Sequence, residues 1–526
     1  MKTPSFIQYL KYALLFGAYF VLNLCSAQED SLIRIIHADE WAFDREARKD
    51  GQILKGSVHF LHKGADLYCD SALLFKKDNK VSAYGNVYLN QGDSLQLWGD
   101  EIQYLGNSGY LKIIASRGKK VKVETDSAFL FSPVIEYFRA NEYLKYSQGG
   151  YLESKSGAAK LWSTNGTYFT EQKRIIFTDS VRLKHDDINL KANTLAFYPE
   201  LDLAEFIDST TIFLKDTTQG IHTTNGNYNL VLNEGFFFDG SEWFSSSQSL
   251  IGDTLFIFNE GQNAWGKCNL ILSDTLENIL VYADSLYMED AGKNASFYRG
   301  AWVEQQNSSD TLLIFSPRLD IVTDSLDQTT LTWFTPVKMF SSNFKALADT
   351  LIYSSIDSSF SWIGNPVLWD ATSQITGKKI QLFLKDGKPH RLYIPELGFM
   401  SSLVEPIGEY NQVSGKTITG YFHNSQLDSM LVEGNGESLY FAIDDKDSTL
   451  IGLNEAAGSS ILIKLDSSKI KDIEFLTKPS STMYPEKDIQ KRKLKRFEWR
   501  GDEQPMQPSD IIFFDVPAQM DSIKAP

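Results

Sequence analysis

One short pattern recurs along most of the chain: an apolar residue, a spacer, a small residue, Asp, a spacer, and further alternating apolar residues. It reads LYCDSALLF at residues 67–75, LWGDEIQY at 97–104, VYADSLYM at 281–288 and LADTLIY at 347–353. A repeat of about 30 residues is typical of a stacked array, in which each unit is too small to bury its own apolar face. The repeat therefore predicts one elongated architecture over most of the chain.

The polar residue at the centre of each copy, here called the corner, separates two stretches of alternating apolar residues. In residues 279–288 the alternation slips by one position after Ala283 and resumes at Leu286. Such a slip predicts a β-bulge that bends the strand and returns its apolar side chains to the same face, with the corner residue facing water. A catalytic or calcium-binding role is disfavoured, because Gly, Asn and Lys occupy the same place in some copies. The corners are Asp70, Asp100, Asp126, Gly157, Asn193, Asp253, Asp284, Asp310, Asp349, Lys378 and Lys416.

A second element recurs between the corners. It reads AYGNVYL at residues 83–89, FTDSVRL at 177–183 and WIGNPVL at 362–368, with turn residues between alternating apolar positions. Aromatic residues make up 13% of the chain, which also favours strands over helices. Both elements predict short strands, so the expected fold class is all-β.

The N-terminus predicts export. Lys2 and Lys11 are followed by an apolar stretch and the small pair Ser26–Ala27, a pattern typical of a secretory signal peptide cleaved after Ala27. A retained membrane anchor is the alternative reading of this stretch. Of the three cysteines, Cys69 and Cys268 would remain after cleavage, and either one disulfide or two free thiols is compatible with an oxidising compartment.

The charge balance excludes one class of partner. The formal net charge is −16, with 67 acidic and 51 basic residues. Nucleic-acid binding requires a concentrated basic surface, which this composition does not supply. We find no phosphate-binding loop, nucleophile elbow, zinc-spaced ligand set or paired-carboxylate cluster, so the chain is not expected to be an enzyme or to need a cofactor.

The alternating signatures around LYCDSALLF, AYGNVYL and GDSLQLWGD (92–100) resemble the OstA-like family, which includes the periplasmic lipopolysaccharide carrier LptA and the N-terminal domain of LptD. The resemblance is densest over residues 56–215, continues weakly to about residue 418, and includes the segment 484–511. It implies an elongated β-jellyroll, a V-shaped solenoid of two sheets built from stacked short antiparallel strands. It further implies a lipopolysaccharide-transport and outer-membrane-assembly protein that shields acyl chains in an apolar trough.

The resemblance completes the expected domain organisation. Residues 1–27 form the signal peptide, 28–55 a lead-in, 56–420 the jellyroll array, 421–477 terminal β units or a cap, and 478–526 a polar basic tail. The expected location is the periplasm, peripheral to the outer membrane. The expected partners are lipopolysaccharide or lipid A, other Lpt-type envelope proteins joined by edge-strand addition, and a second copy of the chain.

Inward-facing positions of the most regular copies are the predicted trough lining, and ordinary core packing is their alternative role. These residues are Leu67, Cys69, Ala72, Leu74, Val87, Leu95, Leu97, Ile102 and Tyr104. No metal site is expected at His59 and His62, because residues three apart on a strand point to opposite faces.

The alternative function is a non-catalytic scaffold that binds an envelope polysaccharide or protein. A ladder of exposed aromatic residues on the outer face would favour this scaffold over a lipid trough. The basic stretch 487–500 is expected to be a solvated helix, with docking on anionic lipid as its other reading.

Overall fold

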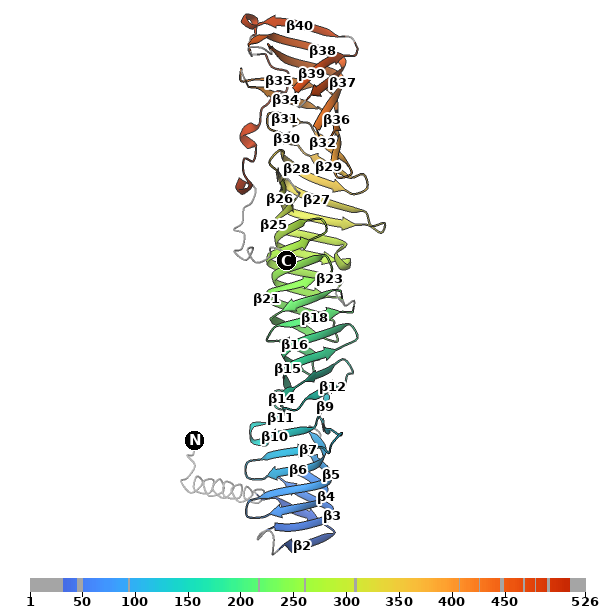
Figure 1. Cartoon of the computed structure of the whole chain (residues 1–526), viewed down its shortest axis with the longest axis vertical. Coiled ribbons are helices and arrows are strands. Elements are labelled where there is room, and N and C mark those ends of the chain that lie inside the picture. Colours follow the sequence, from blue (N-terminus) through green and yellow to red (C-terminus); the bar gives the residue numbers. More distant parts are fainter. Residues whose placement is uncertain are drawn as a thin grey trace, which may run out of the picture. The chain divides into compact units, whose positions relative to one another are not determined.

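The computed structural model of the chain is β-structure almost throughout (Figure 1). It describes residues 32–44, 51–92, 95–215, 218–259, 262–306, 310–405, 407–424, 426–444, 449–466, 469–477, 479–489 and 492–510. All the strand pairs assigned in these ranges are antiparallel, which confirms the predicted all-β fold of stacked antiparallel strands. The predicted signal peptide lies outside the described residues.

The chain divides into two compact units, residues 1–237 and 238–526, with the division inside β21 (Glu234–Phe244). The other strands of unit 1 are β1 (Arg34–His37), β2 (Glu40–Asp44), β3 (Gly51–His62), β4 (Ala65–Phe75), β5 (Lys80–Asn90), β6 (Gln96–Leu105), β7 (Tyr110–Ile114), β8 (Val121–Glu124), β9 (Ala128–Ser132), β10 (Val134–Phe138), β11 (Tyr143–Tyr146), β12 (Gly150–Ser154), β13 (Lys160–Ser163), β14 (Asn165–Phe169), β15 (Arg174–Lys184), β16 (Ile188–Tyr198), β17 (Leu203–Phe206), β18 (Thr210–Leu214), β19 (Gly220–Thr223) and β20 (Asn225–Asn229). β1 and β2 fall in the segment expected to be a lead-in, so the sheets begin at Arg34.

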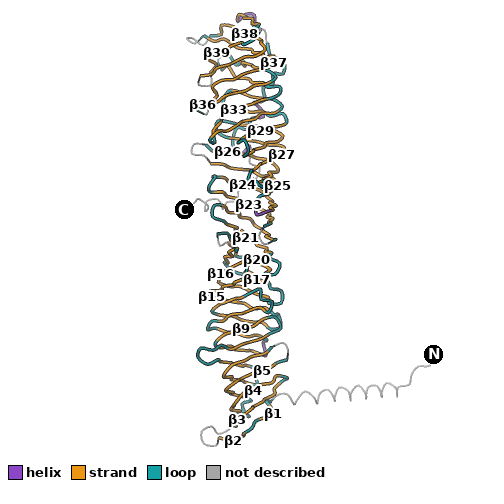
Figure 2. Tube along the Cα trace, turned by 90° about the vertical axis from the view of Figure 1, so that its right-hand side faces the viewer, coloured by secondary structure: helices purple, strands orange, loops and turns teal. Residues whose placement is uncertain are grey.

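Two sheets make up unit 1. Sheet 1 contains β2, β7, β10, β11, β14, β17 and β20, and sheet 2 contains β1, β8, β9, β12, β13, β18 and β19. The long strands β3 to β6, β15 and β16 contribute one half to each sheet. Alternate side chains point into the space between the sheets, as expected for a jellyroll. The strands of this unit follow one another in chain order (Figure 2).

Each long strand passes from one sheet to the other at a register shift. Between β4 and β5 the pairing jumps from Tyr68↔Tyr88 to Ser71↔Tyr84, which leaves an extra residue on β5. Gly85 and Asn86 have left-handed backbones there, with φ of 76° and 44°. Similar left-handed pairs occur at Gly56–Ser57, Asp179–Ser180, Asp239–Gly240, Cys268–Asn269, Arg299–Gly300 and Gly364–Asn365.

The corner aspartates stabilise these bulges but do not form them, which corrects the sequence prediction. Asp70 is not in the left-handed region; its carboxylate accepts a hydrogen bond of 2.9 Å from Asn86 Nδ2 on the neighbouring strand. Asp253 accepts one of 2.6 Å from Asn269 in the same way. The second recurring element therefore supplies the bent backbone, and the corner supplies the acceptor that holds it.

Three of the predicted corners do not lie where the strands bend. Asp126 and Gly157 occupy the turns after β8 and β12, and Asp310 precedes β26 (Thr311–Thr323). Around Asp126 the hydroxyl of Thr125 accepts a hydrogen bond from the backbone N–H of Ala128 at 3.1 Å, an arrangement typical of a tight turn. Asp and Gly favour turns as well as bulges, so the pattern alone did not separate the two.

Unit 2 repeats the arrangement. Its other strands are β22 (Gln248–Phe258), β23 (Asn263–Asp274), β24 (Ile279–Glu289), β25 (Asn294–Gln306), β26, β27 (Thr329–Phe340), β28 (Lys345–Ser354), β29 (Ser359–Ile363), β30 (Val367–Trp369), β31 (Ser373–Thr376), β32 (Lys379–Lys385), β33 (Lys388–Ile394), β34 (Phe399–Val404), β35 (Glu409–Ser414), β36 (Thr417–His423), β37 (Gln426–Ile443), β38 (Leu450–Asp466), β39 (Lys469–Phe475) and β40 (Ser480–Pro485). The strands β22 to β28 bend at register shifts, and β28 then pairs with both β29 and β30.

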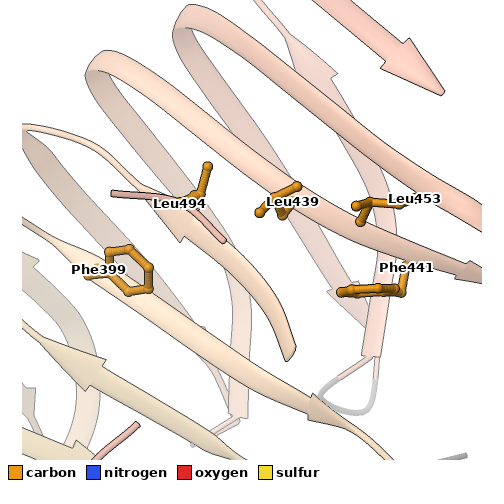
Figure 3. Packing of buried hydrophobic residues seen from close by; sticks show 5 residues of the cluster. All are labelled: Phe399, Leu439, Phe441, Leu453 and Leu494. Atoms are coloured by element: carbon orange, nitrogen blue, oxygen red, sulfur yellow. The ribbon is translucent and has the colours of Figure 1, made fainter. Parts of the chain in front are cut away.

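The C-terminal segment packs on unit 2 in an extended form. Only a short 3-10 turn, Glu486–Asp488, occurs in the described part of the stretch expected to be a solvated helix. Leu494 is 9% exposed and packs in a cluster with four other residues, shown in Figure 3. They are Phe399, Leu439, Phe441 and Leu453. The apolar side chains within the basic stretch give it a binding face, so it is not a solvated tail.

Two buried amide side chains hold the backbone of this segment. Gln374, which is 1% exposed, accepts a hydrogen bond from the backbone N–H of Arg500 at 2.7 Å and donates one to the carbonyl of Glu498 at 2.7 Å. Gln412, which is 2% exposed, accepts one from the N–H of Leu494 at 2.8 Å. Gln374 on β31 is the direct cross-strand partner of Trp369 on β30, and Trp369 is the partner of Lys345 on β28. On β28 the side chain of Ala346 is buried between the sheets, so that of its neighbour Lys345 lies on the opposite, outer face. The segment therefore covers the outer face of a sheet.

Candidate functional site

The interior between the two sheets of unit 1 is lined by the residues that the repeat predicts to face inward. All nine predicted lining residues are buried, and none is more than 6% exposed. Leu67, Cys69, Val87 and Leu97 project from the sheet 2 halves of their strands, whereas Ala72, Leu74, Ile102 and Tyr104 project from the sheet 1 halves; Leu95 lies just before β6. Their inward position is therefore observed, while contact with a lipid stays a prediction.

Side chains of the chain itself fill this interior in the present conformation. Phe60, Phe177, Phe197 and Phe206 are among its fully buried aromatic residues. A cavity of about 20 Å³ lies beside Phe60, and its full lining is Ile33, Phe60, His62, Ala65, Leu67, Leu89, Gln91, Tyr104, Gly109, Leu111, Tyr137 and Arg139. The space is enough for about one water molecule, so an acyl chain enters only if the sheets move apart.

The outer ends of sheets 1 and 2 meet along one side of unit 1, here called the seam. Near the cavity, Nδ1 of His62 from sheet 2 lies 2.5 Å from the hydroxyl of Tyr104 from sheet 1. The guanidinium of Arg139 donates to the carbonyl oxygens of His62 and Lys63, at 3.3 and 2.5 Å. Burial raises the pKa of Tyr104, although Arg139 opposes the shift, so this phenol stays neutral and able to donate.

Further polar contacts bridge the seam along the unit. The hydroxyl of Tyr137 donates to Gln91 Oε1 at 3.4 Å, and that of Ser156 to Asp202 at 2.9 Å. The third contact joins Asn233 Nδ2 to an Asp187 oxygen at 3.1 Å. In the described part of unit 1, each hydrogen bond that we identify across the seam uses a side chain. Side chains can exchange these partners for water without breaking a backbone ladder, so the seam is the side on which the sheets separate most easily.

An indentation of about 240 Å³ lies on the seam. Most of its lining is polar and includes Asp126, Glu142, Glu171 and Glu200, together with Lys173. Lys173 forms an ion pair with Glu200, which raises the pKa of the lysine. At its base, burial and the charge of Glu200 raise the pKa of Tyr168 to about 12. The indentation is acidic at its rim, so it does not suit an anionic head group.

The histidines and cysteines do not form a chemical centre in the described residues. His62 is buried, whereas His59 points outward and lies 2.7 Å from an oxygen of Asp66, in agreement with the expected opposite faces. No group of three or more His, Cys, Asp or Glu side chains suited to a metal occurs in the part of the chain that the structure covers. Cys69 and Cys268 are free thiols, and burial raises the pKa of Cys69 to about 12, which makes this thiol unreactive.

One protein-family model matches the N-terminal part of unit 1. Residues 30–193 match the profile of the family described as OstA-like protein. Over these residues, about a third of the chain, the sequence matches the OstA-like family. The match includes the nine lining residues, and it agrees with the resemblance identified from the repeat.

Two other comparisons add little to this assignment. A search of curated proteins finds no significant match. Among solved structures, the chain is similar to LptH of Pseudomonas aeruginosa, described as the LptA homologous periplasmic component of the conserved lipopolysaccharide transport device. The two share 11% identity over 27% of this chain and 95% of that one, with a TM-score of 0.20. None of the helices in the described residues has the length and apolar character to cross a membrane.

The OstA-like segment also carries a row of outward-facing side chains that the sequence analysis did not identify. They are direct cross-strand neighbours on the outer face of sheet 2, in the order His59, Tyr68, Tyr88, Trp98, Lys122, Phe131, Tyr151, Trp162, Arg182 and Lys191. Ring centroids are 4.3 Å apart for His59 and Tyr68, 5.2 Å for Tyr88 and Trp98, and 4.6 Å for Phe131 and Tyr151. The available signal was an aromatic residue two positions before a corner, as at Tyr68 and Trp98.

Proposed function

We propose that this protein is a non-catalytic lipopolysaccharide-transport and outer-membrane-assembly protein of the periplasm, which shields acyl chains between the two sheets of unit 1. The OstA-like match of residues 30–193 supports this proposal, since the family resemblance implies a periplasmic carrier. The predicted signal peptide supports export. Lipopolysaccharide, through its lipid A part, is the proposed cargo.

The seam is the observation that carries the proposal. A neutral intramolecular hydrogen bond contributes about 0.5–1.5 kcal/mol to stability, and one that involves a charged group such as Arg139 about 1.5–3 kcal/mol, so the side-chain contacts near the cavity together contribute several kcal/mol. Burial of one methylene is worth about 0.8 kcal/mol, so an acyl chain of a dozen carbons gains on the order of 10 kcal/mol before the costs of ordering. Acyl chains therefore supply enough free energy to separate the sheets locally. Apolar contact is non-directional, so an acyl chain slides along the lining without breaking a specific bond.

Site-specific photo-crosslinking tests where the lipid binds. A photoreactive phenylalanine analogue at Leu97 faces the interior, and the same analogue at Gln103, on the other half of the same strand, faces solvent. We expect ultraviolet light to attach lipopolysaccharide to the variant at Leu97 and not to the variant at Gln103. Equal labelling at the two positions, or labelling at Gln103 alone, contradicts an interior site.

Other Lpt-type envelope proteins and a second copy of the chain are proposed partners through the open end of unit 1. β1 and β2 both pair with β3, and their other edges have no partner strand in the described residues. Trp41 and Phe43 on β2 are 54% and 66% exposed, although they are register partners of the buried Leu54 and Gln52. The apolar lining is thus uncovered at this end, where another jellyroll could continue it.

A scaffold that binds an envelope polysaccharide is the second candidate function. The aromatic row on the outer face of sheet 2 favours it, because these rings are available from outside while the sheets stay closed. The two functions are compatible, since they use opposite faces of sheet 2.

A further inference from the structure

A groove of about 710 Å³ lies on unit 1 at the basic end of the aromatic row. Its lining includes Trp162 with four cationic side chains. Strand register explains part of this gathering: Trp162 on β13 is the direct partner of Arg182 on β15, which is the partner of Lys191 on β16. The cations of the groove are Lys120, Arg182, Lys184 and Lys191.

The groove is positive in a protein with a net charge of −16. No Asp or Glu belongs to its lining. None of its four cations forms an ion pair with a residue that the structure describes, whereas Lys122 in the same row is paired with Glu124 at 2.8 Å. Unpaired cations gathered in a hollow concentrate anions there, because their fields add and are only partly screened.

Trp162 adds an apolar surface to this groove. The residue is 39% exposed, and no ring stacks on it among the described residues, in contrast to the rings of Tyr88 and Trp98. Tyr151, its partner on β12, is occupied by Lys120, whose Nζ lies 4.4 Å from the ring centroid. Thr164 and Ser180 place hydroxyl groups in the lining. An indole surface, hydroxyls and cations together suit a sugar ring that carries a carboxylate or phosphate.

On the corresponding outer face of unit 2, a segment of the chain itself is bound, and its contacts show which side chains hold a peptide there. There, residues 494–500 are held by the buried amides of Gln374 and Gln412, which bond to main-chain groups. The amides that line the groove of unit 1, Gln148 and Asn189, are exposed. The groove therefore lacks the buried amides that hold a peptide in unit 2, and its chemistry favours a glycan over an acidic peptide.

We propose that this groove binds an anionic sugar unit of an acidic polysaccharide, with Arg182 and Lys191 at the charged group and Trp162 against the ring. The proposal rests on the second candidate function and is independent of lipid binding between the sheets. It assigns a site on the outer face, so a glycan without any acyl chain is a sufficient ligand.

Affinity electrophoresis of the full chain in gels containing polygalacturonic acid, dextran or polyglutamate tests the proposal. We expect polygalacturonic acid to retard the protein, and dextran to have no effect. The paired substitution Arg182→Gln with Lys191→Gln should raise the apparent dissociation constant for polygalacturonic acid at least tenfold. Trp162→Ala should raise it severalfold. The matched control is Lys145→Gln, which removes an exposed lysine from the outer face of sheet 1; it should behave as wild type.

Each other outcome counts against a defined part of the proposal. Equal retardation by polyglutamate means that the groove recognises charge and not sugar. Retardation that Arg182→Gln with Lys191→Gln leaves unchanged overturns the site, although a polysaccharide scaffold would then still stand. Absence of retardation by polygalacturonic acid overturns both the site and that scaffold. Unchanged circular dichroism and urea unfolding of each variant show that a loss of binding does not reflect unfolding.

Discussion

At the scale of single residues, corner aspartates act as hydrogen-bond acceptors for neighbouring strands and loops. Asp100 accepts from the backbone N–H of Ser116 at 2.7 Å and from Lys119 Nζ at 3.2 Å. The hydrogen bond from the Ser116 backbone is the main cause that lowers the pKa of Asp100. A lowered pKa means that the folded state favours the ionised carboxylate, which adds stability above the unfolded-state pKa near 3.9 and loses it as the pH falls through the folded-state pKa.

We predict that Asp100→Asn lowers the free energy of unfolding by about 1 kcal/mol at pH 7, because a neutral acceptor replaces a charged one. The difference from wild type should shrink between pH 7 and pH 2, because the wild-type carboxylate takes up a proton as the pH falls through its lowered folded-state pKa. Urea unfolding at both pH values measures it, with Asp186→Asn, at an exposed turn residue, as the control. A difference that is the same at both pH values contradicts this role of the charge.

Gly85 shows why the bulge element contains glycine. A Cβ on Gly85, at a φ of 76°, would lie 2.4 Å from Oδ2 of Asp70. Gly64 has nearly the same φ, 75°, with nothing within 4 Å of its Cβ position. We predict that Gly64→Ala costs about 1 kcal/mol of folding free energy from backbone strain alone, and that Gly85→Ala costs clearly more. Denaturant unfolding tests this; equal costs would show that Asp70 does not restrict the site.

At the scale of elements, the extended C-terminal segment stabilises unit 2 through its apolar side chains, and Leu494 is the one that belongs to the buried cluster. We predict that Leu494→Ala lowers the free energy of unfolding of this unit by about 2–3 kcal/mol, because it leaves a cavity in the cluster of Phe399 and Leu439. Trypsin should then cleave sooner at Lys495 and Arg496 than in wild type. Met506→Ala, at a residue that is 70% exposed, serves as the control. Unchanged cleavage would mean that the segment is held without Leu494.

The terminal strand β2 is the second element with a testable role. If the open end of unit 1 joins another jellyroll, Trp41→Ser should reduce association, because Trp41 presents a largely exposed apolar surface there. Glu40→Ser, at the adjacent exposed residue, should not. Sedimentation over a range of concentrations checks both variants. Identical behaviour of the two would exclude β2 as the joining edge.

At the scale of the whole molecule, the repeat was sufficient to predict the all-β array and the inward positions. Alternation has a period of two, so a residue such as Leu97 is assigned to a face without knowledge of its partners. Which strand carries the bulge was not predictable, because Asp70 and Gly85 both belong to turn-forming residue types. The seam contacts and the groove at Trp162 were also missed, since they join side chains from different copies of the repeat.

The central claim is that acyl chains enter unit 1 by separating the sheets at the seam. A reducible crosslink tests it most directly: a bifunctional methanethiosulfonate reagent joins Gln91→Cys to Tyr137→Cys, in a Cys268→Ser background, and so replaces a bridge between the ends of two long side chains. Glu136→Cys with Lys112→Cys, a cross-strand pair within sheet 1, is the control. We measure lipid A by mass spectrometry of solvent extracts after incubating each purified protein with lipopolysaccharide. The account predicts that the crosslink abolishes lipid A recovery only for the seam pair and that reduction of the crosslink restores it, whereas undiminished recovery from the crosslinked seam pair would contradict it.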